Sequence, residues 1–480
     1  MRYGLWFSLF GLLFGWSDAS MASETAQTLN LTSHPAGYFA LVIFVLAYLL
    51  VMTEELTHLR KSKPVLLAAG LIWAVIALVY AEHNLPHLVE EAVRHSLLEY
   101  AELMLFLLVA MTYISAMEER KVFDALRCWL LQRGFSFRAL FWMTGVLSFC
   151  ISPVADNLTT ALLMCAVVLA MGGNNRKFVS LACINIVVAA NAGGAFSPFG
   201  DITTLMVWQK GVIAFQDFFV LFVPSLVNFL IPAAIMHFFI PNERPLASAD
   251  NIVTKPGAKR IVLLFLCTIV TAVIFHSALG LPPVIGMLTG LAYLQFFGYY
   301  LSKTLPKAIA KQKAIARANG DAVSLERLGE AAPFDVFSEV ASAEWDTLLF
   351  FCGVVLCVGG LGYMGYLAMM SEVMYIQLGA TQANILVGVL SSVIDNIPVM
   401  FAVLTMQPEM STGQWLLVTM TAGVGGSLLS IGSAAGVALM GQARGQYTFL
   451  SHLKWTPVIA LGYAASIAVH MWINASLFVS

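Results

Sequence analysis

The sequence has few charged residues: Asp, Glu, Lys and Arg make up 11% of its 480 residues, and the formal net charge is −2. Its Lys and Arg residues lie between apolar stretches and form no basic face of the kind that binds nucleic acid, so nucleic acid is not an expected partner. Segments of alternating apolar and polar residues do not recur either, which excludes a transmembrane β-barrel.

The sequence also lacks a cysteine pattern typical of disulfides or bound metals. Its seven cysteines include no Cys-x-x-Cys pair, their number is odd, and most of them lie inside apolar stretches. Neither a disulfide framework nor a structural metal site is therefore expected, and no cofactor is indicated. We interpret these cysteines as small apolar side chains.

Apolar residues dominate what is present. They make up 59% of the chain, and the mean hydropathy is +0.83, unlike the balance in soluble globular domains. Runs long enough to cross a ~30 Å hydrocarbon core as helices recur along the chain, so we predict an all-α protein of the lipid bilayer. The expected spans are 39–53, 64–81, 97–116, 178–208, 216–240, 260–276, 281–299, 345–366, 413–441 and 455–476.

The start of the chain resembles a targeting segment. Arg2 is followed by an apolar stretch over 3–16 and by small residues around 20–22. Residues 1–22 are therefore predicted to form a cleavable signal sequence or an uncleaved N-terminal helix.

The charges of the loops predict how the spans are oriented. The basic loops are 60–63, 120–138, 176–177, 244–260, 303–327 and 444–454. By the positive-inside rule these loops are cytoplasmic, whereas three other loops, which contain only Arg94 between them, are external. Two further apolar stretches, 139–171 and 383–406, are interrupted in the middle. The spans alternate consistently only if 139–171 is a re-entrant hairpin from the cytoplasmic face and 383–406 one from the external face.

Three motifs of the first half recur in the second half in the same order. Glu102–Phe106 (ELMLF) matches Asp346–Phe350 (DTLLF), SPVADNL (152–158) resembles SSVIDNI (391–397), and NAGGAFSPFGDITTLM aligns with GVGGSLLSIGSAAGVA. Because the loop charges orient the two copies oppositely, we predict two inverted-topology repeats, a plan common among secondary transporters.

Each predicted repeat contains about five transmembrane helices, one re-entrant hairpin and one broken helix. The first repeat covers 39–240, with the hairpin 139–171 and the broken helix 178–208. The predicted parts that follow are a linker at 241–259 and a second repeat over 260–476, which includes a cytoplasmic segment at 300–343, the hairpin 383–406 and the broken helix 413–441.

Each predicted hairpin turns at an Asp-Asn pair. Asp156-Asn157 follows Pro153, and Asp395-Asn396 precedes Pro398. Proline and short polar side chains end helices and leave N–H and C=O groups that can face an ion. A charged side chain at the membrane centre costs ~2.5–3.5 kcal/mol on insertion scales, so these aspartates indicate a functional site. The alternative is that each aspartate only caps a helix of its hairpin.

The first broken helix contains a third aspartate. Glycines and Pro198 precede Asp201, Thr203 and Thr204, so an unwound backbone is expected to expose carbonyl and hydroxyl oxygens beside a carboxylate. Such hard oxygen ligands suit a hard cation such as sodium. The second copy has hydroxyls but no carboxylate, so the predicted site is asymmetric. Several hydroxyl groups are candidates to contact the ion, and the alternative for each is a bond to the local backbone. They are those of Thr203, Thr204, Ser152, Ser391, Ser430 and Ser433.

Three more titratable residues are candidates for proton access or gating. Glu102 and Asp346 align in the repeat and are expected in the first turns of apolar helices that start on opposite faces. If these helices border a cavity, both acids can relay protons; otherwise they are solvated or cap their helices. His95, just before the first of these helices, is the third candidate, because histidine is the side chain that commonly changes charge at physiological pH; its alternative is a solvated interfacial position.

The expected cavity contains three acids and no fixed base, because no Lys or Arg lies near the hairpin turns or within 191–209. It should attract cations and repel dicarboxylates. Burial favours the protonated form of a carboxyl group, whereas a bound cation favours the ionised form. A proton and a sodium ion are therefore expected to compete for the same oxygens.

Four motifs resemble a known family. They are SPVADNLTT (152–160), SPFGDITTLM (197–206), EWDTLLFF (344–351) and SSVIDNIP (391–398), which closely resemble those of NhaD-type sodium/proton antiporters of the ion transporter superfamily. The resemblance covers most of the chain. It implies efflux of sodium and lithium in exchange for protons across a bacterial inner membrane, favoured at alkaline pH. The residues that it implicates are Asp156, Asp201, Asp346, Asp395, Glu102, Asn396 and neighbouring polar residues such as Asn157 and Thr159. Many superfamily members are dimers that work by an elevator motion, so a homodimer is a candidate assembly.

Two other functions fit parts of the pattern. A sodium-coupled symporter of di- or tricarboxylates on the same fold would use the aspartates only for the coupling ion and would need a cationic or amide-rich cradle for its substrate. An intramembrane aspartyl protease also buries two aspartates, but it requires Tyr-Asp and Gly-x-Gly-Asp motifs, which this sequence lacks. The chain is therefore not expected to be an enzyme.

Overall fold

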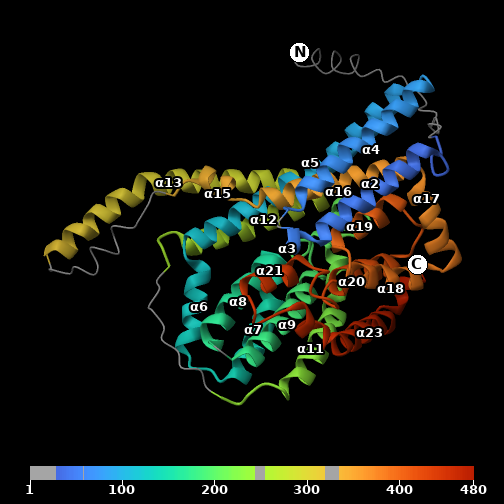
Figure 1. Cartoon of the computed structure of the whole chain (residues 1–480). Helices are drawn as coiled ribbons and strands as arrows, with labels where there is room; N and C mark the ends of the chain where they lie inside the picture. Colours follow the sequence, from blue (N-terminus) through green and yellow to red (C-terminus); the bar gives the residue numbers. More distant parts are fainter. Residues whose placement is uncertain (1–28, 58, 174, 244–253, 319–333, 480) are drawn as a thin grey trace, which may run out of the picture.

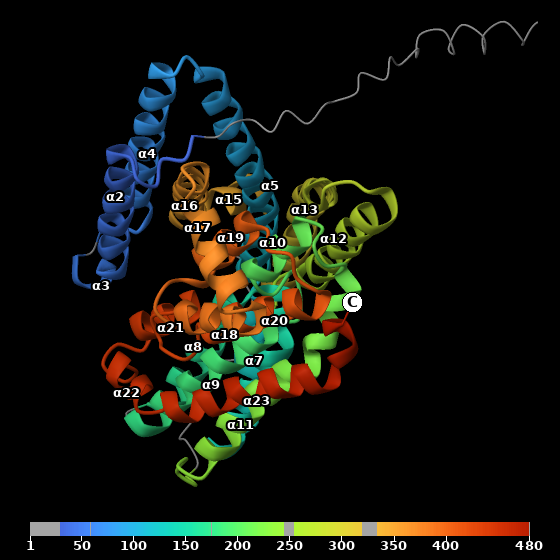
Figure 2. The ribbon, with the colours of Figure 1, turned by 90° about the vertical axis from the view of Figure 1, so that its right-hand side faces the viewer.

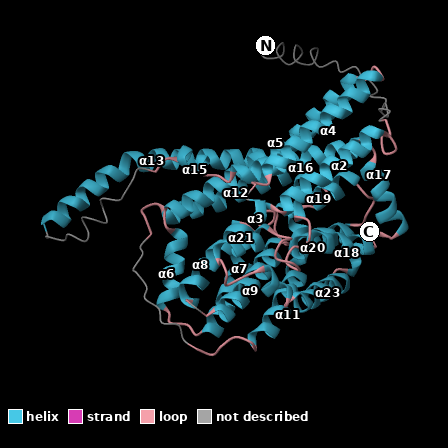
Figure 3. Cartoon of the chain, in the orientation of Figure 1, coloured by secondary structure: helices cyan, strands magenta, loops and turns pink. Residues whose placement is uncertain are grey.

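The computed structural model describes residues 29–57, 59–173, 175–243, 254–318 and 334–479. Within these ranges every regular element is a helix, as the sequence predicts (Figure 3). The predicted signal sequence lies outside the described residues, as do more than half of the predicted linker 241–259 and part of the segment 300–343.

Ten helices in the described ranges are long and apolar enough to cross a bilayer, which makes the chain a multi-pass membrane protein. They are α2 (Pro35–Met52), α4 (Ser62–Glu82), α5 (Pro86–Glu119), α7 (Phe137–Ala155), α9 (Arg176–Gly194), η1 with α11 (Phe215–Leu221 and Phe222–His237), α12 (Ala258–Leu279), α13 (Pro283–Ala318), α16 (Trp345–Tyr363) and α23 (Thr456–Ile473).

Shorter helices connect or extend these ten. They are α3 (Glu54–Thr57), α6 (Val122–Gln132), α8 (Asn157–Gly172), α10 (Ile202–Gln209), α15 (Val336–Ala341), α17 (Tyr366–Ser371), the π-helical η2 (Glu372–Gln377), α18 (Ala380–Ser391), α19 (Asn396–Met406), α20 (Thr412–Gly425), α21 (Ala434–Gln442), α22 (Phe449–Leu453) and η3 (Ala475–Phe478).

Each of the four stretches that the sequence marks as interrupted contains two helices. The stretch 139–171 consists of α7 and α8, which meet at Asp156, and 383–406 consists of α18 and α19. The stretch 178–208 divides into α9 and α10, and 413–441 divides into α20 and α21. The inverted orientation and the re-entrant course of the hairpins stay predictions.

The helices form two groups, which Figure 2 shows one above the other. A frame consists of α2, α4, α5, α12, α13, α15 and α16, and within it α12 packs against α13, α4 against α16, and α5 against α13 and α16. A bundle consists of α7–α9, α11, α18, α20, α21 and α23, with close pairs α7 and α9, α18 and α20, and α11 and α23. Helices α10 and α19 lie between the two groups, and α4 projects with the start of α5 beyond the other helices (Figures 1 and 2).

One hydrogen bond occurs at matching positions in the two halves of the bundle. The hydroxyl of Ser152 donates to the carbonyl of Ala190 at 2.6 Å, and that of Ser391 donates to the carbonyl of Ala422 at 2.7 Å. Each serine thereby connects the first helix of a predicted hairpin, α7 or α18, to the first part of a broken helix, α9 or α20. These matching contacts support the predicted internal repeat.

Three expected boundaries are corrected. Helix α5 begins at Pro86 rather than near residue 97, because proline suits the first position of a helix and Arg94 pairs with Glu90 one turn earlier. Glu102 therefore lies more than four turns inside α5 and not in its first turn. The basic loop 120–138 contains the helix α6, and α13 continues to Ala318 through Ala- and Lys-rich sequence that favours helix beyond the expected span.

We predict that Gly200→Ala and Gly432→Ala each lower the thermal stability of the detergent-solubilised protein. A Cβ at residue 200 would lie 2.8 Å from the carbonyl oxygen of Ser152, and one at residue 432 would lie 2.4 Å from that of Ser392. Such overpacking costs typically about 1–3 kcal/mol.

Gly70→Ala is the matched control, because no atom lies within 4 Å of its Cβ position on α4 and alanine is the better helix former. Equal melting temperatures for Gly200→Ala, Gly432→Ala and the unchanged protein would contradict the described packing of the broken helices against the hairpins.

Candidate functional site

Asp156 occupies the break between α7 and α8 with both carboxylate oxygens held. Its φ of 55° and ψ of 162° form a backbone conformation that residues other than glycine rarely adopt, so the surrounding contacts must hold it. One oxygen accepts a hydrogen bond from the backbone N–H of Thr159 at 2.8 Å, and the other accepts one from the Thr159 hydroxyl at 2.8 Å. The carboxylate thus lies at the N-terminus of α8, where the helix dipole favours negative charge.

Asp201 joins the two halves of the chain. It is the N-cap of α10, is only 4% exposed, and accepts a hydrogen bond from the Thr203 N–H at 3.1 Å. The side-chain amide of Asn396, at the start of α19, lies 3.2 Å from each of its two oxygens. In the second half Ser433 is the N-cap of α21 with nearly the same backbone angles, so a hydroxyl stands where the first half has a carboxylate.

Asp395 is held less completely than the other two aspartates. It immediately precedes α19, but its side chain does not cap that helix. Its Oδ1 atom is buried and has no hydrogen-bond partner among the described residues, and the same is true of the Thr204 hydroxyl. A buried polar atom without a partner costs about 1–3 kcal/mol, so these atoms are candidates for contact with an ion, a proton or water.

The buried Thr203 hydroxyl also has no partner among the described residues, whereas the other polar residues predicted for the site form hydrogen bonds or close polar contacts within the protein. The Asn157 amide donates to the side-chain oxygen of Asn191 at 3.2 Å. The hydroxyls of Ser152 and Ser391 donate to carbonyls as described above. That of Ser430 lies 3.3 Å from the Met440 sulfur, and that of Ser433 accepts from the Gly436 N–H at 3.2 Å. Sequence reasoning did not single out Asn191, although an amide beside the predicted helix break was the available signal.

One cavity of about 1040 Å³ brings the predicted aspartates together. Asp156, Asp201 and Asp395 all line it, as do Asn157, Thr159 and Asn396. Helices from both the bundle and the frame form its wall. Sequence segments nearly 240 residues apart therefore meet at one polar surface.

The expectation that this cavity has no basic residue was wrong. Arg60, Lys61 and Arg127 line it together with eight acidic residues. Lys61 lies 5.1 Å from the centre of the Phe350 ring and interacts electrostatically with Asp395. The sequence places Lys61 in a loop, and only the packing of α4 against α16 brings it to the cavity. Acidic residues still outnumber basic residues on the cavity wall.

The two acids predicted for proton access differ in position. Asp346 is in the first turn of α16, lines the cavity and accepts a hydrogen bond of 2.5 Å from the Ser62 hydroxyl. Glu102 is partly exposed in the interior of α5 and is not among the residues that line the cavity.

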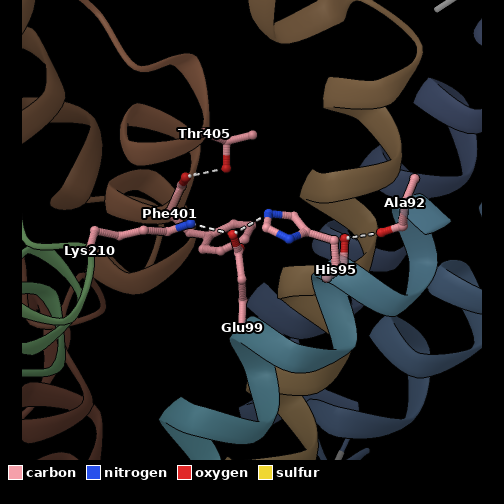
Figure 4. Close-up of polar contacts among 7 residues, drawn as sticks. Ala92, His95, Glu99, Lys210, Phe401 and Thr405 are labelled. Carbon is pink, nitrogen blue, oxygen red and sulfur yellow. Dashed lines mark hydrogen bonds and ion pairs between the residues drawn. The ribbon is translucent and has the colours of Figure 1, made fainter. Parts of the chain in front are cut away.

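His95 belongs to a polar contact outside the cavity (Figure 4). Its Nε2 lies 2.9 Å from a carboxylate oxygen of Glu99, one turn further along α5, and its side chain is 71% exposed. The same Glu99 oxygen forms an ion pair with Lys210, just after α10. The contact therefore connects the frame to the end of the broken helix. Sequence reasoning missed Glu99 and Lys210, since no local pattern pairs them.

Known proteins resemble the chain over nearly its full length. It is 63% identical over 470 residues to a protein of Alkalimonas amylolytica named Na(+)/H(+) antiporter NhaD, covering 98% of this chain and 97% of that one. The identity to the Vibrio cholerae protein of the same name is 64% over 463 residues, covering 96% and 97%. The chain belongs to the NhaD family of sodium/proton antiporters. It is therefore a transporter rather than an enzyme.

The family lies within a wider group of transporters. The profile of the citrate transporter family, CitMHS, matches residues 48–423. An Arabidopsis thaliana protein named Sodium/proton antiporter 1 is 29% identical over 448 residues, which cover 90% of this chain and 72% of that protein. The matched region includes all three aspartates of the cavity.

We predict that Asn396 and Asp201 are energetically coupled. Asn396→Ala leaves a buried carboxylate without its amide donors, whereas the same change in an Asp201→Ala background leaves no charge unpaired. The double-mutant cycle, measured by unfolding of the detergent-solubilised protein at alkaline pH, should give a coupling free energy of about 1.5–3 kcal/mol.

A cycle between Asn396→Ala and Asp217→Ala serves as the control, because no contact joins these residues in the described chain. Its effects should add within about 0.5 kcal/mol. Additive effects in the Asn396 and Asp201 cycle as well would show that the cross-half hydrogen bonds are not formed.

Proposed function

We propose that this protein exchanges Na+, and also Li+, for H+ across the bacterial inner membrane, and that Asp156, Asp201 and Asp395 bind cation and proton alternately. The observation that carries the proposal is the convergence of the three carboxylates on one cavity, with one Asp395 oxygen left without a partner. The names of the NhaD relatives support the exchanged ions.

The donor set suits a small hard cation. Carboxylate oxygens, the Thr204 hydroxyl and backbone carbonyls at the breaks of α7–α8 and α9–α10 are all oxygen ligands. The three aspartates line one cavity, but the described residues include no group of three or more His, Cys, Asp or Glu side chains that could hold a metal ion, so hydroxyl and carbonyl oxygens have to complete the cation site. Thr159 fixes Asp156 and Asn396 fixes Asp201, so two carboxylates are preorganised. Asp395 retains a free oxygen for the ion.

Exchange follows from competition at these oxygens. A protonated carboxyl loses the negative charge that attracts sodium, and bound sodium excludes the proton. The site therefore carries either sodium or protons when it is exposed to one side of the membrane and then to the other. In a cell at alkaline pH, sodium leaving the site and protons replacing it would lower internal sodium and contribute to pH homeostasis.

Access in this conformation is from the side of the basic loops. The cavity reaches Arg60, Lys61 and Arg127, which belong to loops predicted to be cytoplasmic. We infer that the structure is an inward-open form and that Asp346, on the cavity wall, passes protons from the cytoplasm. Glu102 and His95 lie away from this cavity, so their proposed roles belong to the opposite access route, where Lys210 and Glu99 join α10 to α5.

A sodium-coupled symporter of organic anions is the second candidate. The match to the citrate transporter family and the three basic residues of the cavity favour it. Eight acidic residues on the same wall oppose a dianionic or trianionic substrate, because like charges destabilise each other there. The higher identity to the NhaD antiporters also supports ion exchange.

We predict that Asp156→Asn and Asp395→Asn each lower the exchange rate by about tenfold or more, because each removes a charged ligand. The assay uses everted membrane vesicles from an antiporter-deficient host, energised to an acidic interior, with a pH-sensitive dye. Sodium or lithium should release the pH gradient in the unchanged protein, whereas potassium is the comparison cation.

Asp217→Asn is the matched control, since Asp217 does not line the cavity, and it should retain the original rate. No dye response to sodium from correctly inserted protein, combined with sodium-dependent uptake of labelled citrate, would replace the antiporter proposal with the symporter.

We also predict that protons raise the apparent KM for sodium. If both ions bind the same carboxylates, KM rises about tenfold per unit fall in pH for each proton displaced, while the maximal rate changes little. Sodium titrations of the vesicle assay at several pH values measure this dependence. A KM that is constant while the maximal rate follows pH would place proton binding elsewhere.

A further inference from the structure

A second cavity, of about 530 Å³, lies at the start of α12 in the frame. Residues 254–260 line it on one side, and α13 lines it on the other side through residues that include Tyr300 and Thr304. None of these residues lines the aspartate cavity. The proposed transport of ions therefore makes no use of this place.

The chemistry of this second cavity is basic. Its lining includes Lys255, Lys259 and Arg260 and no acidic residue. Lys255 is neutralised by Glu119 at 2.9 Å, whereas Lys259 and Arg260 are exposed and form no ion pair with a described carboxylate. Arg260 lies 5.9 Å from the centre of the Tyr300 ring, which holds the guanidinium beside the cavity. Two positive charges are thus available to an anion.

The backbone adds to this positive character. The residue before α12 is Gly257, with φ of 96°, and no side chain caps the helix. No acidic residue lies in its first turn. The N–H groups of Ala258 and Arg260 donate to the carbonyls of Lys255 and Gly257, whereas that of Lys259 has no backbone acceptor among the described residues. The helix dipole places partial positive charge at this end, so it favours an anion beside Lys259 and Arg260.

An apolar stripe continues from the cavity along α12. Leu263, Leu266, Val270 and Ile274 are each 44–61% exposed, and their spacing places them on one face of the helix, continuing from Arg260. The stripe from Leu263 to Ile274 is ~16 Å long at ~1.5 Å per residue, close to half of a ~30 Å hydrocarbon core. Phe296 and Tyr300 are exposed on α13, and tyrosine is typical of the membrane–water boundary.

We propose that this cavity binds the phosphate headgroup of an anionic phospholipid whose acyl chains lie along the α12 stripe. The side chains of Lys259 and Arg260 and the backbone N–H of Lys259 contact the phosphate. A free phosphate ion shares this headgroup chemistry but has no acyl chains to bury, so the combination of charge and apolar stripe selects the lipid. The inference depends neither on the aspartates nor on the ions that they carry.

The bound lipid would stabilise one corner of the frame. The Lys255 N–H donates to the Arg120 carbonyl at 3.0 Å, and its side chain pairs with Glu119, so the lining segment is attached to the end of α5. The segment that binds the lipid is thereby joined to α5, and residues of α5 up to Glu118 line the transport cavity.

Native mass spectrometry of the full-length protein in detergent tests this inference. The probes are phosphatidylglycerol, zwitterionic phosphatidylcholine with the same acyl chains, and inorganic phosphate. We predict that Lys259→Gln/Arg260→Gln weakens binding of the tightest phosphatidylglycerol by about 30-fold, because each basic residue near an anionic lipid surface contributes roughly fivefold. Phosphatidylcholine should bind more weakly to the unchanged protein.

Arg176→Gln/Lys177→Gln is the matched control. It also removes two exposed charges from the start of a helix, but Asn175 caps that helix, α9, and neither residue lines the cavity. This variant should bind phosphatidylglycerol as the unchanged protein does. Thermal unfolding without added lipid verifies that both variants are folded.

Three results would overturn the proposal. Equal losses in both double variants would mean that only overall charge matters. Displacement of phosphatidylglycerol by millimolar inorganic phosphate would mean a simple anion site. Lipid-free dimers of the unchanged protein that dissociate when Lys259 and Arg260 are replaced would mean that a second copy of the chain covers this face.

Discussion

The hydrogen bond between the Asn396 amide and the Asp201 carboxylate is the interaction on which the site depends. It holds a buried negative charge at the point where the broken helix of the first half meets α19 of the second half. An unpaired carboxylate at that depth would be expensive, because no water or counter-ion compensates its lost hydration. The contact therefore requires both halves to be folded and packed together before the site exists.

The helix breaks also stabilise buried polar groups through contacts within the protein. Asp156 and Asp201 each precede the first turn of a short helix and accept hydrogen bonds from backbone N–H groups of that turn. Gly200 and Gly432 let the unwound segments approach the backbone of the predicted hairpins more closely than a Cβ would permit. Polar backbone at these breaks is thus satisfied by protein close to the groups that we propose to bind the ion.

The charged residues of the cavity come from the frame, from the bundle and from the helices between them. The bundle contributes Asp156 and the intervening α10 and α19 bring Asp201 and Asp395, whereas Lys61 comes from the start of α4 in the frame. A base close to Asp395 weakens the attraction of that carboxylate for a cation. Movement of the frame relative to the bundle would change this distance and with it the affinity for the cation.

By itself the sequence determined the all-helical membrane class, the four interrupted stretches and the three aspartates, because apolar length, glycine, proline and isolated acids act locally and leave a direct pattern. It also carried the family resemblance through short motifs around those aspartates. It did not place Lys61 at the cavity, pair Asn157 with Asn191 or locate Glu102 deep inside α5. Those positions depend on how helices far apart in the chain pack against one another, and only the tertiary structure decided them.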